Sequence, residues 1–177
     1  GGLASESDAV APVSRRGRRR AAAEAAWLRF GERTGKAVQI FRAAGIYGAG
    51  RSAFDQVRSG RARRIDKPGQ KFSRIHKDDL AVAVQASISA PRSGAIYNLC
   101  DDEPAPSAEV LAHAYTLLGR QPPPLTPFSE AEAGMSAMAK EFWSDNRRID
   151  NRRLHGELGI ALAYPTYREG LAAILAK

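Results

Sequence analysis

The sequence contains little cysteine, little histidine and no long apolar run, and each shortage excludes a class of protein. One residue of 177 is cysteine, which excludes a disulfide framework and a cysteine-based zinc site. The three histidines are scattered, so neither a histidine triad nor a metal site is expected. No apolar segment approaches the ~20 residues that cross a bilayer, and the start lacks the apolar core of a signal peptide. We therefore expect a cytoplasmic protein with no membrane partner and no metal.

What is present is a globular composition with a surplus of positive charge. Hydrophobic residues make up 44% of the chain, and 27 Lys and Arg against 19 Asp and Glu give a formal net charge of +8. Part of the surplus lies in the arginine run of residues 15–20. No nucleic-acid-binding motif accompanies this run, and its arginines do not share one helix face. We therefore expect a solvated helix start and no nucleic-acid partner, although such a partner would bind through this run.

The order of the periodic segments predicts an α/β protein with a mainly parallel sheet. Residues 1–14 are small and polar and predict a loop or disordered start, and residues 15–177 form the folded region. Because helical and strand patterns alternate, the strands are expected to run parallel. Helices are expected over 18–33, 78–89, 107–119, 130–140, 150–158 and 166–176, and strands over 37–41, 72–75 and 95–99. Ser14 and Ser107 are expected to cap the first and third of these helices, and Gly35 is expected to end the first.

The most informative segment is the glycine-rich turn after the strand expected over 37–41. It reads Gly45-Ile-Tyr-Gly-Ala-Gly50. Ligands on open α/β sheets bind beyond the carboxyl ends of strands, and glycine lets the backbone approach a ligand closely. Tyr47 and Arg51 would offer a hydroxyl and a cation to an anionic group. The residues alone leave a second interpretation open, in which Tyr47 only packs within an ordinary turn.

Other polar positions receive structural interpretations. Asp78 or Asp79 is expected to cap the helix that begins there, because a carboxylate satisfies free backbone donors. His76 has no second metal ligand nearby and is expected to hydrogen-bond within its loop. Cys100 is expected to be a small buried hydrophobe, because its neighbour Asp101 raises rather than lowers a thiol pKa.

Five segments in a fixed order carry a resemblance to a known family. They read P-x-S-x-R-G-R-x-R-x-x-x-E-x-x-W from Pro12, V-Q-I-F-R-A-A-G-I-Y-G-A-G-R, F-S-R-I-H-K-D-D-L-A, Y-N-L-C-D-D-E-P and Y-P-T-Y-R-E-G-L. Together they resemble the carboxyl-terminal part of NAD(P)-dependent epimerase/dehydratase-like proteins, in the extended or atypical branch of the short-chain dehydrogenase/reductase superfamily. The resemblance implies a partial Rossmann-like fold, a doubly wound parallel sheet with a carboxyl-terminal substrate-binding region. The amino-terminal Rossmann half is expected to be missing from this chain.

The resemblance also implies where each role falls. The family's acid/base tyrosine and its lysine correspond to Arg16 and Arg20, which carry charge but supply no group that titrates near neutral pH. Phe72 stands where nucleotide-sugar enzymes commonly carry a phosphate-binding arginine. The implied cofactor contacts are Ala44, Gly45 and Ile46, and the implied substrate contacts are Tyr47, Arg51, His76 and Asn146.

These implications favour one function and leave two alternatives. The favoured function is the substrate-side half of an NAD(P)-dependent epimerase/dehydratase-like protein that acts on, or binds, a small anionic molecule. NAD or NADP is the implied cofactor, a homodimer is compatible with the sequence, and this chain alone is expected to be inactive. The first alternative is a non-catalytic NAD(P)-binding or regulatory scaffold, suggested by Arg16 and Arg20. The second is a basic nucleic-acid-binding protein.

Overall fold

The strands of the computed structural model pair in parallel with partners far away in the sequence. The structure describes residues 2–12, 14–146 and 148–176. Their strands form four two-stranded sheets, which confirms the α/β prediction; a doubly wound sheet stays a prediction. The pairs are β1 (Leu3–Ala4) with β8 (Arg148–Ile149), β2 (Ile40–Ala43) with β6 (Ile96–Leu99), β3 (Gly45–Tyr47) with β5 (Arg74–His76), and β4 (Ile65–Asp66) with β7 (Thr126–Pro127).

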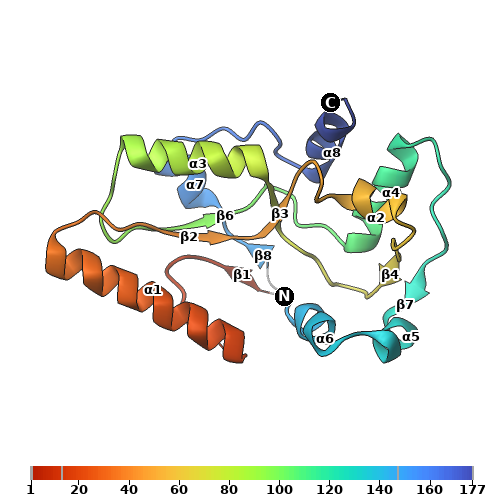
Figure 1. Cartoon of the computed structure of the whole chain (residues 1–177), viewed down its shortest axis with the longest axis horizontal. Coiled ribbons are helices and arrows are strands. Elements are labelled where there is room, and N and C mark those ends of the chain that lie inside the picture. The colour runs from red at the N-terminus through yellow and green to blue at the C-terminus, as the bar shows by residue number, and fades with distance from the viewer. Residues whose placement is uncertain (1, 13, 147, 177) are drawn as a thin grey trace.

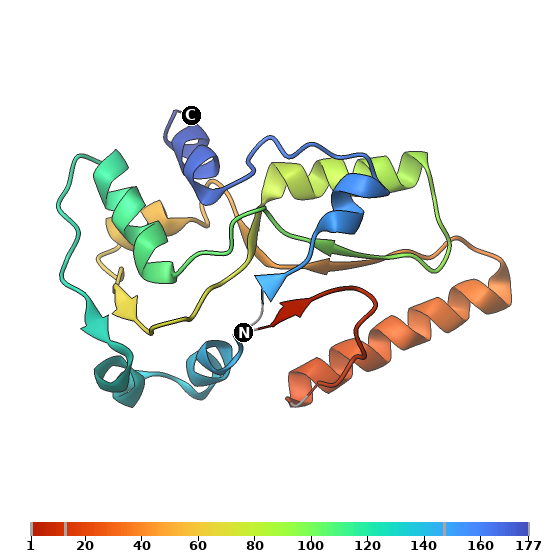
Figure 2. The same cartoon turned by 180° about the vertical axis from the view of Figure 1, so that it is seen from behind.

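Helices cover both faces of the β2–β6 pair. Figures 1 and 2 show α1 (Arg15–Thr34) on one side and α3 (Lys77–Ser89) with α7 (Arg152–Gly156) on the other. An ion pair between Glu24 and Arg42 joins α1 to β2. Apolar side chains from β5, α3, β6 and the segment around α7 form a buried core between these layers: Ile75, Ala83, Tyr97, Leu99, Leu154 and Ile160.

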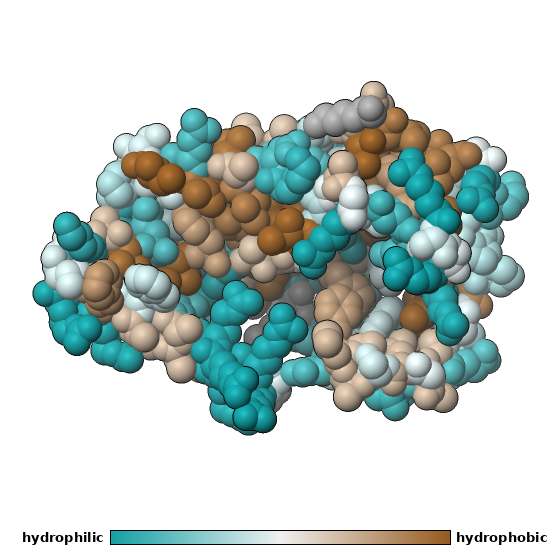
Figure 3. Space-filling model, viewed as in Figure 1, coloured by the Kyte–Doolittle hydropathy of each residue, from teal (hydrophilic) through white to brown (hydrophobic). Residues whose placement is uncertain are grey.

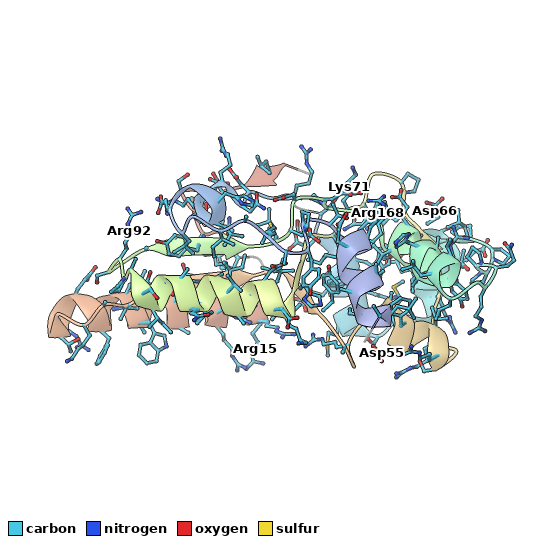
Figure 4. All side chains as sticks on the ribbon, turned by 90° about the horizontal axis from the view of Figure 1, so that it is seen from above. Arg15, Asp55, Asp66, Lys71, Arg92 and Arg168 are labelled. Atoms are coloured by element: carbon cyan, nitrogen blue, oxygen red, sulfur yellow. The ribbon has the colours of Figure 1, made fainter. Side chains whose placement is uncertain are left out.

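A second core packs three helices at the other end of the molecule. These are α2 (Ala53–Arg58), α4 (Ser107–Leu117) and α8 (Tyr167–Leu175). Figure 4 shows Asp55 and Asp66 at this end and Arg92 at the opposite end. The short elements α5 (Phe128–Ala131), η1 (Glu132–Gly134) and α6 (Ala137–Ser144) lie below it in Figure 1. The buried side chains of this core include Phe54, Val57, Leu111, Ala114, Tyr167 and Leu171.

Local signals in the sequence predicted the ends of α1 well. Ser14 caps the helix, because its Oγ accepts a hydrogen bond of 3.0 Å from the amide of Gly17. Gly35 ends it in the left-handed region at φ +66°, which a glycine adopts without strain. The strand expected over 37–41 begins only at Ile40 and extends toward the glycine turn.

The structure differs from two expectations, one about the start of a helix and one about the first residues of the chain. Ser107, expected as a cap, is the first residue of α4, and Pro106 occupies the cap position. The segment expected to be a loop or disordered start contains β1, and the side chain of Glu6 beyond it is buried. None of the helices in the described part of the chain is both long enough and apolar enough to cross a lipid bilayer.

Candidate functional site

Two neighbouring cavities open where β2 ends, and Ala44 lines both of them. The larger, about 800 Å³, lies along β2 between α1 and residues 4–12; we call it the edge groove. The smaller, about 650 Å³, lies between α6, residues 71–73 and the start of α1; we call it the aromatic pocket. Figure 3 shows the surface hollowed between the start of α1 and α6. Ligands bind at the carboxyl ends of parallel strands, so this position is a candidate functional site.

The start of α1 contributes a cation to each cavity. Arg16 lines the aromatic pocket, and Arg20 lines the edge groove. The two residues are one helical turn apart, so they project from the same side of α1. The structure therefore brings Arg16, Arg20 and Ala44 to these two adjoining cavities, and the roles of all three toward a cofactor or substrate stay predictions. A guanidinium group donates hydrogen bonds and accepts none, so both side chains are suited to holding an anionic group.

The expected cofactor contacts continue from Ala44 into β3. The amide of Ala44 donates to the carbonyl oxygen of Leu99 at 3.0 Å, which fixes the end of β2. Gly45 and Ile46 follow in β3, and 37% of Ile46 is exposed. Small residues at this position leave the backbone accessible to a flat ligand.

Tyr47 and His76 pack in the interior, outside the lining of both cavities. Their rings meet edge to face with centroids 5.2 Å apart, and the Tyr47 hydroxyl donates to the carbonyl oxygen of Thr166 at 3.5 Å. Burial raises the pKa of Tyr47 far above its ordinary value, with a smaller contribution from Asp101. These contacts hold β3 and β5 against α8, and the substrate role of the two residues stays a prediction.

The expected cap of α3 was assigned to the wrong residue. The helix is capped by His76, whose ring nitrogen Nδ1 accepts a hydrogen bond of 3.3 Å from the amide of Asp78. Asp79 instead accepts hydrogen bonds from the amides of Ala163 and Tyr164, at 2.8 and 3.0 Å. No local pattern in the sequence predicts this contact, because it joins residues more than 80 positions apart.

Arg51 and Asn146 have different surroundings. Arg51 is exposed, and its backbone exchanges two hydrogen bonds with Gly48 that close the glycine turn. The Asn146 side chain accepts from the amide of Lys71 at 3.3 Å and donates to the carbonyl oxygen of Gly69 at 3.1 Å. Because Lys71 lines the aromatic pocket, Asn146 positions a pocket residue. Direct substrate contact by Arg51 or Asn146 stays a prediction.

The outer edges of β2 and β6, the edges that do not pair with each other, differ in their hydrogen bonding. Side chains satisfy the outer edge of β6: Glu6 accepts from the amide of Asn98, Arg153 donates to the carbonyl oxygen of Ile96, and Asn151 donates to that of Cys100. Within residues 2–12, 14–146 and 148–176, β2 pairs with β6 alone. Its other edge faces the edge groove. An open strand edge of this kind is a template for pairing with another strand.

Asp101 is a buried carboxyl group directly after β6. It is 2% exposed, and among the described residues neither of its oxygens has a hydrogen-bond partner. Burial raises its pKa to about 7, against a smaller lowering effect from the nearby Arg74 guanidinium. Burial likewise raises the pKa of Cys100, which is free and buried as predicted. From the sequence, Asp101 was considered only for its effect on Cys100, although its place directly after a buried strand was a usable signal.

The raised pKa of Asp101 predicts a pH-dependent stability. An unfolded aspartate has a pKa of about 3.9, so between about pH 5 and pH 7 the folded protein holds a proton that the unfolded chain has released. The stabilisation is present at low pH and is lost as the pH rises through about 7. Relative to Asp101→Asn, the free energy of unfolding of the parent should fall by about 1.4 kcal/mol per pH unit in this range. Urea unfolding at several pH values measures this change in the free energy of unfolding. Replacing the exposed Asp66 by asparagine is the control. If the free energies of unfolding of the parent and of Asp101→Asn change with pH in parallel, the prediction is wrong.

Known proteins are similar to this chain in sequence or in structure. No protein-family model matches the sequence. The curated 3-diazoavenalumate denitrifying reductase of a Streptomyces species is 31% identical over 97 residues, which cover 55% of this chain and 32% of that protein. A conserved protein of unknown function from Silicibacter pomeroyi DSS has a solved structure with a TM-score of 0.92 and 44% identity, covering 99% of this chain and 61% of that chain.

A third comparison is with an enzyme in complex with NAD. The structure of dTDP-glucose 4,6-dehydratase from Bacillus anthracis str. Ames has a TM-score of 0.77 and 19% identity, covering 99% of this chain and 55% of that chain. The chain thus spans less than two thirds of each of these three proteins. From the parallel strands and these similarities, we conclude that this chain has the α/β fold of the dTDP-glucose 4,6-dehydratase solved in complex with NAD.

Proposed function

We propose that this chain forms the substrate-side part of an NAD(P)-dependent epimerase/dehydratase-like protein that acts on a small molecule. The observation that carries the proposal is the position of Ala44, which directly follows β2 and lines both cavities. Parallel α/β sheets bind ligands at this end of their strands. The two cavities also have the volumes that small-molecule sites have, about 300–1,000 Å³.

The residues at the end of β2 fit a nicotinamide dinucleotide. The run Ala43-Ala44-Gly45 has no side chain larger than a methyl group, so a flat ring can approach the backbone. The half-exposed Ile46 offers an apolar surface beside it. Ala44, Gly45 and Ile46 would therefore hold the nicotinamide end of the cofactor. Bound NAD(P) supplies hydride transfer.

The open edge of β2 supports a dinucleotide site that this chain does not complete alone. The edge of β6 is satisfied by Glu6, Arg153 and Asn151, whereas β2 faces the edge groove. We infer that a strand from polypeptide outside these residues pairs with β2 and carries the rest of the cofactor site. The solved Silicibacter pomeroyi relative, of which this chain covers 61%, has the additional length that this requires.

Arg16 and Arg20 determine what the site can do with a substrate. Both guanidinium groups can bind and orient an anionic group, but neither can exchange a proton near neutral pH. A substrate hydroxyl would therefore need another group as its acid or base. This observation favours a second candidate, a non-catalytic NAD(P)-binding scaffold. Consumption of NADPH or NADH in the presence of a substrate would exclude it. A cytoplasmic location and a homodimer stay predictions.

Cofactor titration of a completed protein tests the proposal. We would fuse to this chain the part of the Silicibacter pomeroyi protein that it does not cover, and follow thermal unfolding with NADH and NADPH. At one hundred times the dissociation constant, the preferred cofactor should stabilise the fusion by about 2.7 kcal/mol. Ala44→Leu should abolish the shift, because its side chain enters both cavities, while the exposed Ala49→Leu is the matched control. A completed protein that neither cofactor stabilises would contradict the proposal.

A further inference from the structure

The wall of the aromatic pocket exposes large apolar side chains that nothing described in this chain covers. The rings of Phe72 and Phe142 are stacked, with centroids 4.6 Å apart and planes 5° from parallel. Phe142 is nevertheless 58% exposed, and Met138 beside it is 68% exposed. Both line the pocket. Covering such a surface with an apolar ligand removes it from water, which is favourable.

Contacts behind the stack hold this wall in place. Trp143 is buried and meets Phe72 edge to face at 5.1 Å. Trp143 also meets the ring of Phe128, with centroids 5.5 Å apart. Lys67 donates a hydrogen bond to the carbonyl oxygen of Trp143. A wall that is already ordered loses little conformational freedom when a ligand binds. The stack is therefore a preformed surface rather than a flexible patch.

The charges of the pocket restrict what it can bind. Among the residues that the structure describes, the lining contains two cations, Arg16 and Lys71, and two carboxylates, Glu141 and Asp145, whose formal charges sum to zero. Figure 4 labels Lys71, which projects from the ribbon at the edge of the molecule. A diphosphate carries several negative charges and would lie near the Glu141 carboxylate, whereas the described lining residues hold no surplus of cations to offset that repulsion. A neutral or singly charged ligand meets no such penalty.

Two hydroxyl groups complete the lining. The Ser73 Oγ accepts from the amide of Ile149 at 3.2 Å, and the Ser136 Oγ accepts from the amide of Ala139 at 3.2 Å. Each hydroxyl also has one hydrogen to donate. Both residues line the pocket, so they can donate to a polar substituent of a bound molecule.

We propose that the aromatic pocket binds a flat aromatic molecule with at most one negative charge. Its ring stacks on the surface formed by Phe72 and Phe142, and its acidic group points toward Arg16 and Lys71. The inference rests on the proposed function, because this molecule would be the substrate placed beside the nicotinamide at Ala44. It separates this chain from the structurally similar dehydratase, whose name gives a nucleotide sugar as its substrate.

Calorimetric titration with two probes tests the proposal. The folded chain should bind 4-hydroxycinnamate, an aromatic monocarboxylate, at least about tenfold more tightly than thymidine diphosphate, a difference of about 1.4 kcal/mol. Phe142→Ala should weaken the binding of 4-hydroxycinnamate about tenfold. Because Phe142 is largely exposed, this variant should keep its fold, which circular dichroism checks. Phe30→Ala removes another partly exposed phenylalanine, outside the pocket, and should leave the affinity unchanged.

Each outcome has one meaning. Tighter binding of thymidine diphosphate, no binding of 4-hydroxycinnamate, or an unchanged affinity in folded Phe142→Ala would overturn the aromatic-ligand proposal. The titration needs no nicotinamide cofactor. If the fusion binds 4-hydroxycinnamate but neither NADH nor NADPH stabilises it, only the proposed function is overturned. If a cofactor stabilises the fusion but 4-hydroxycinnamate does not bind, only the aromatic-ligand proposal is overturned.

Discussion

Replacing Asp79 by alanine is expected to lower the free energy of unfolding by about 2–4 kcal/mol. The side chain is 2% exposed, and its two oxygens accept hydrogen bonds from the amides of Ala163 and Tyr164. These bonds fasten the first turn of α3 to the segment that leads into α8. Alanine removes the shared acceptor and leaves two backbone donors without their partner, at the point where the two packed regions of the molecule are joined.

Urea unfolding measures this loss, and two further variants define its cause. Asp79→Asn keeps one carbonyl oxygen as an acceptor, so its loss in the free energy of unfolding should be smaller than that of Asp79→Ala. Asp78→Ala is the matched control: its side chain is 37% exposed, so the loss should stay below about 1 kcal/mol. Equal losses in Asp78→Ala and Asp79→Ala would mean that the general charge at the helix start matters and the two hydrogen bonds do not.

Replacing Gly170 by alanine is expected to destabilise the protein by about 1–3 kcal/mol, although alanine is the better helix former. A Cβ at this position would lie 2.0 Å from the Tyr47 Oη and 2.7 Å from its Cζ. The ring of Tyr47 would therefore have to leave its site against α8 and lose its hydrogen bond to Thr166.

A double-mutant cycle with Tyr47→Ala identifies this contact. In the Tyr47→Ala background Gly170→Ala should be neutral or stabilising, because the colliding ring is gone. Gly156→Ala in α7 is the matched control, since a Cβ there meets nothing within 4 Å. If Gly170→Ala stabilises the protein as the control does, Tyr47 does not occupy the position described.

The parts of the fold that depend on neighbouring residues were predictable from the sequence. Ser14 and Gly35 act on backbone groups within a few residues of themselves, so they indicated the ends of α1. The apolar segments around Phe41 and Tyr97 indicated buried strands, and the two segments do pair in parallel. The glycine-rich segment after β2 predicted a ligand site, which stays a prediction; its first three residues form β3, and Ala44 just before it lines both cavities.

The interior polar groups were not predictable in the same way. Asp79 satisfies donors at residues 163 and 164, and His76 takes over the cap that a carboxylate was expected to form. The burial of Asp101 depends on how the chain after β6 packs against Arg74. The contacts of Asp79 and Asp101 join segments far apart in the chain, which no local pattern encodes. The His76 cap is local, but a histidine ring is a less common cap than the carboxylates that follow it.

For this protein, local chemistry was enough to establish the alternation of helices and parallel strands and the two ends of α1. Those features follow from backbone geometry and from the spacing of apolar side chains within a few turns. The folded molecule alone decided that Phe72 stacks on Phe142, that β6 has a satisfied edge while β2 has an open one, and that Arg16 and Arg20 line different cavities. These depend on distances between remote segments, and such distances are set by the packing of the whole chain.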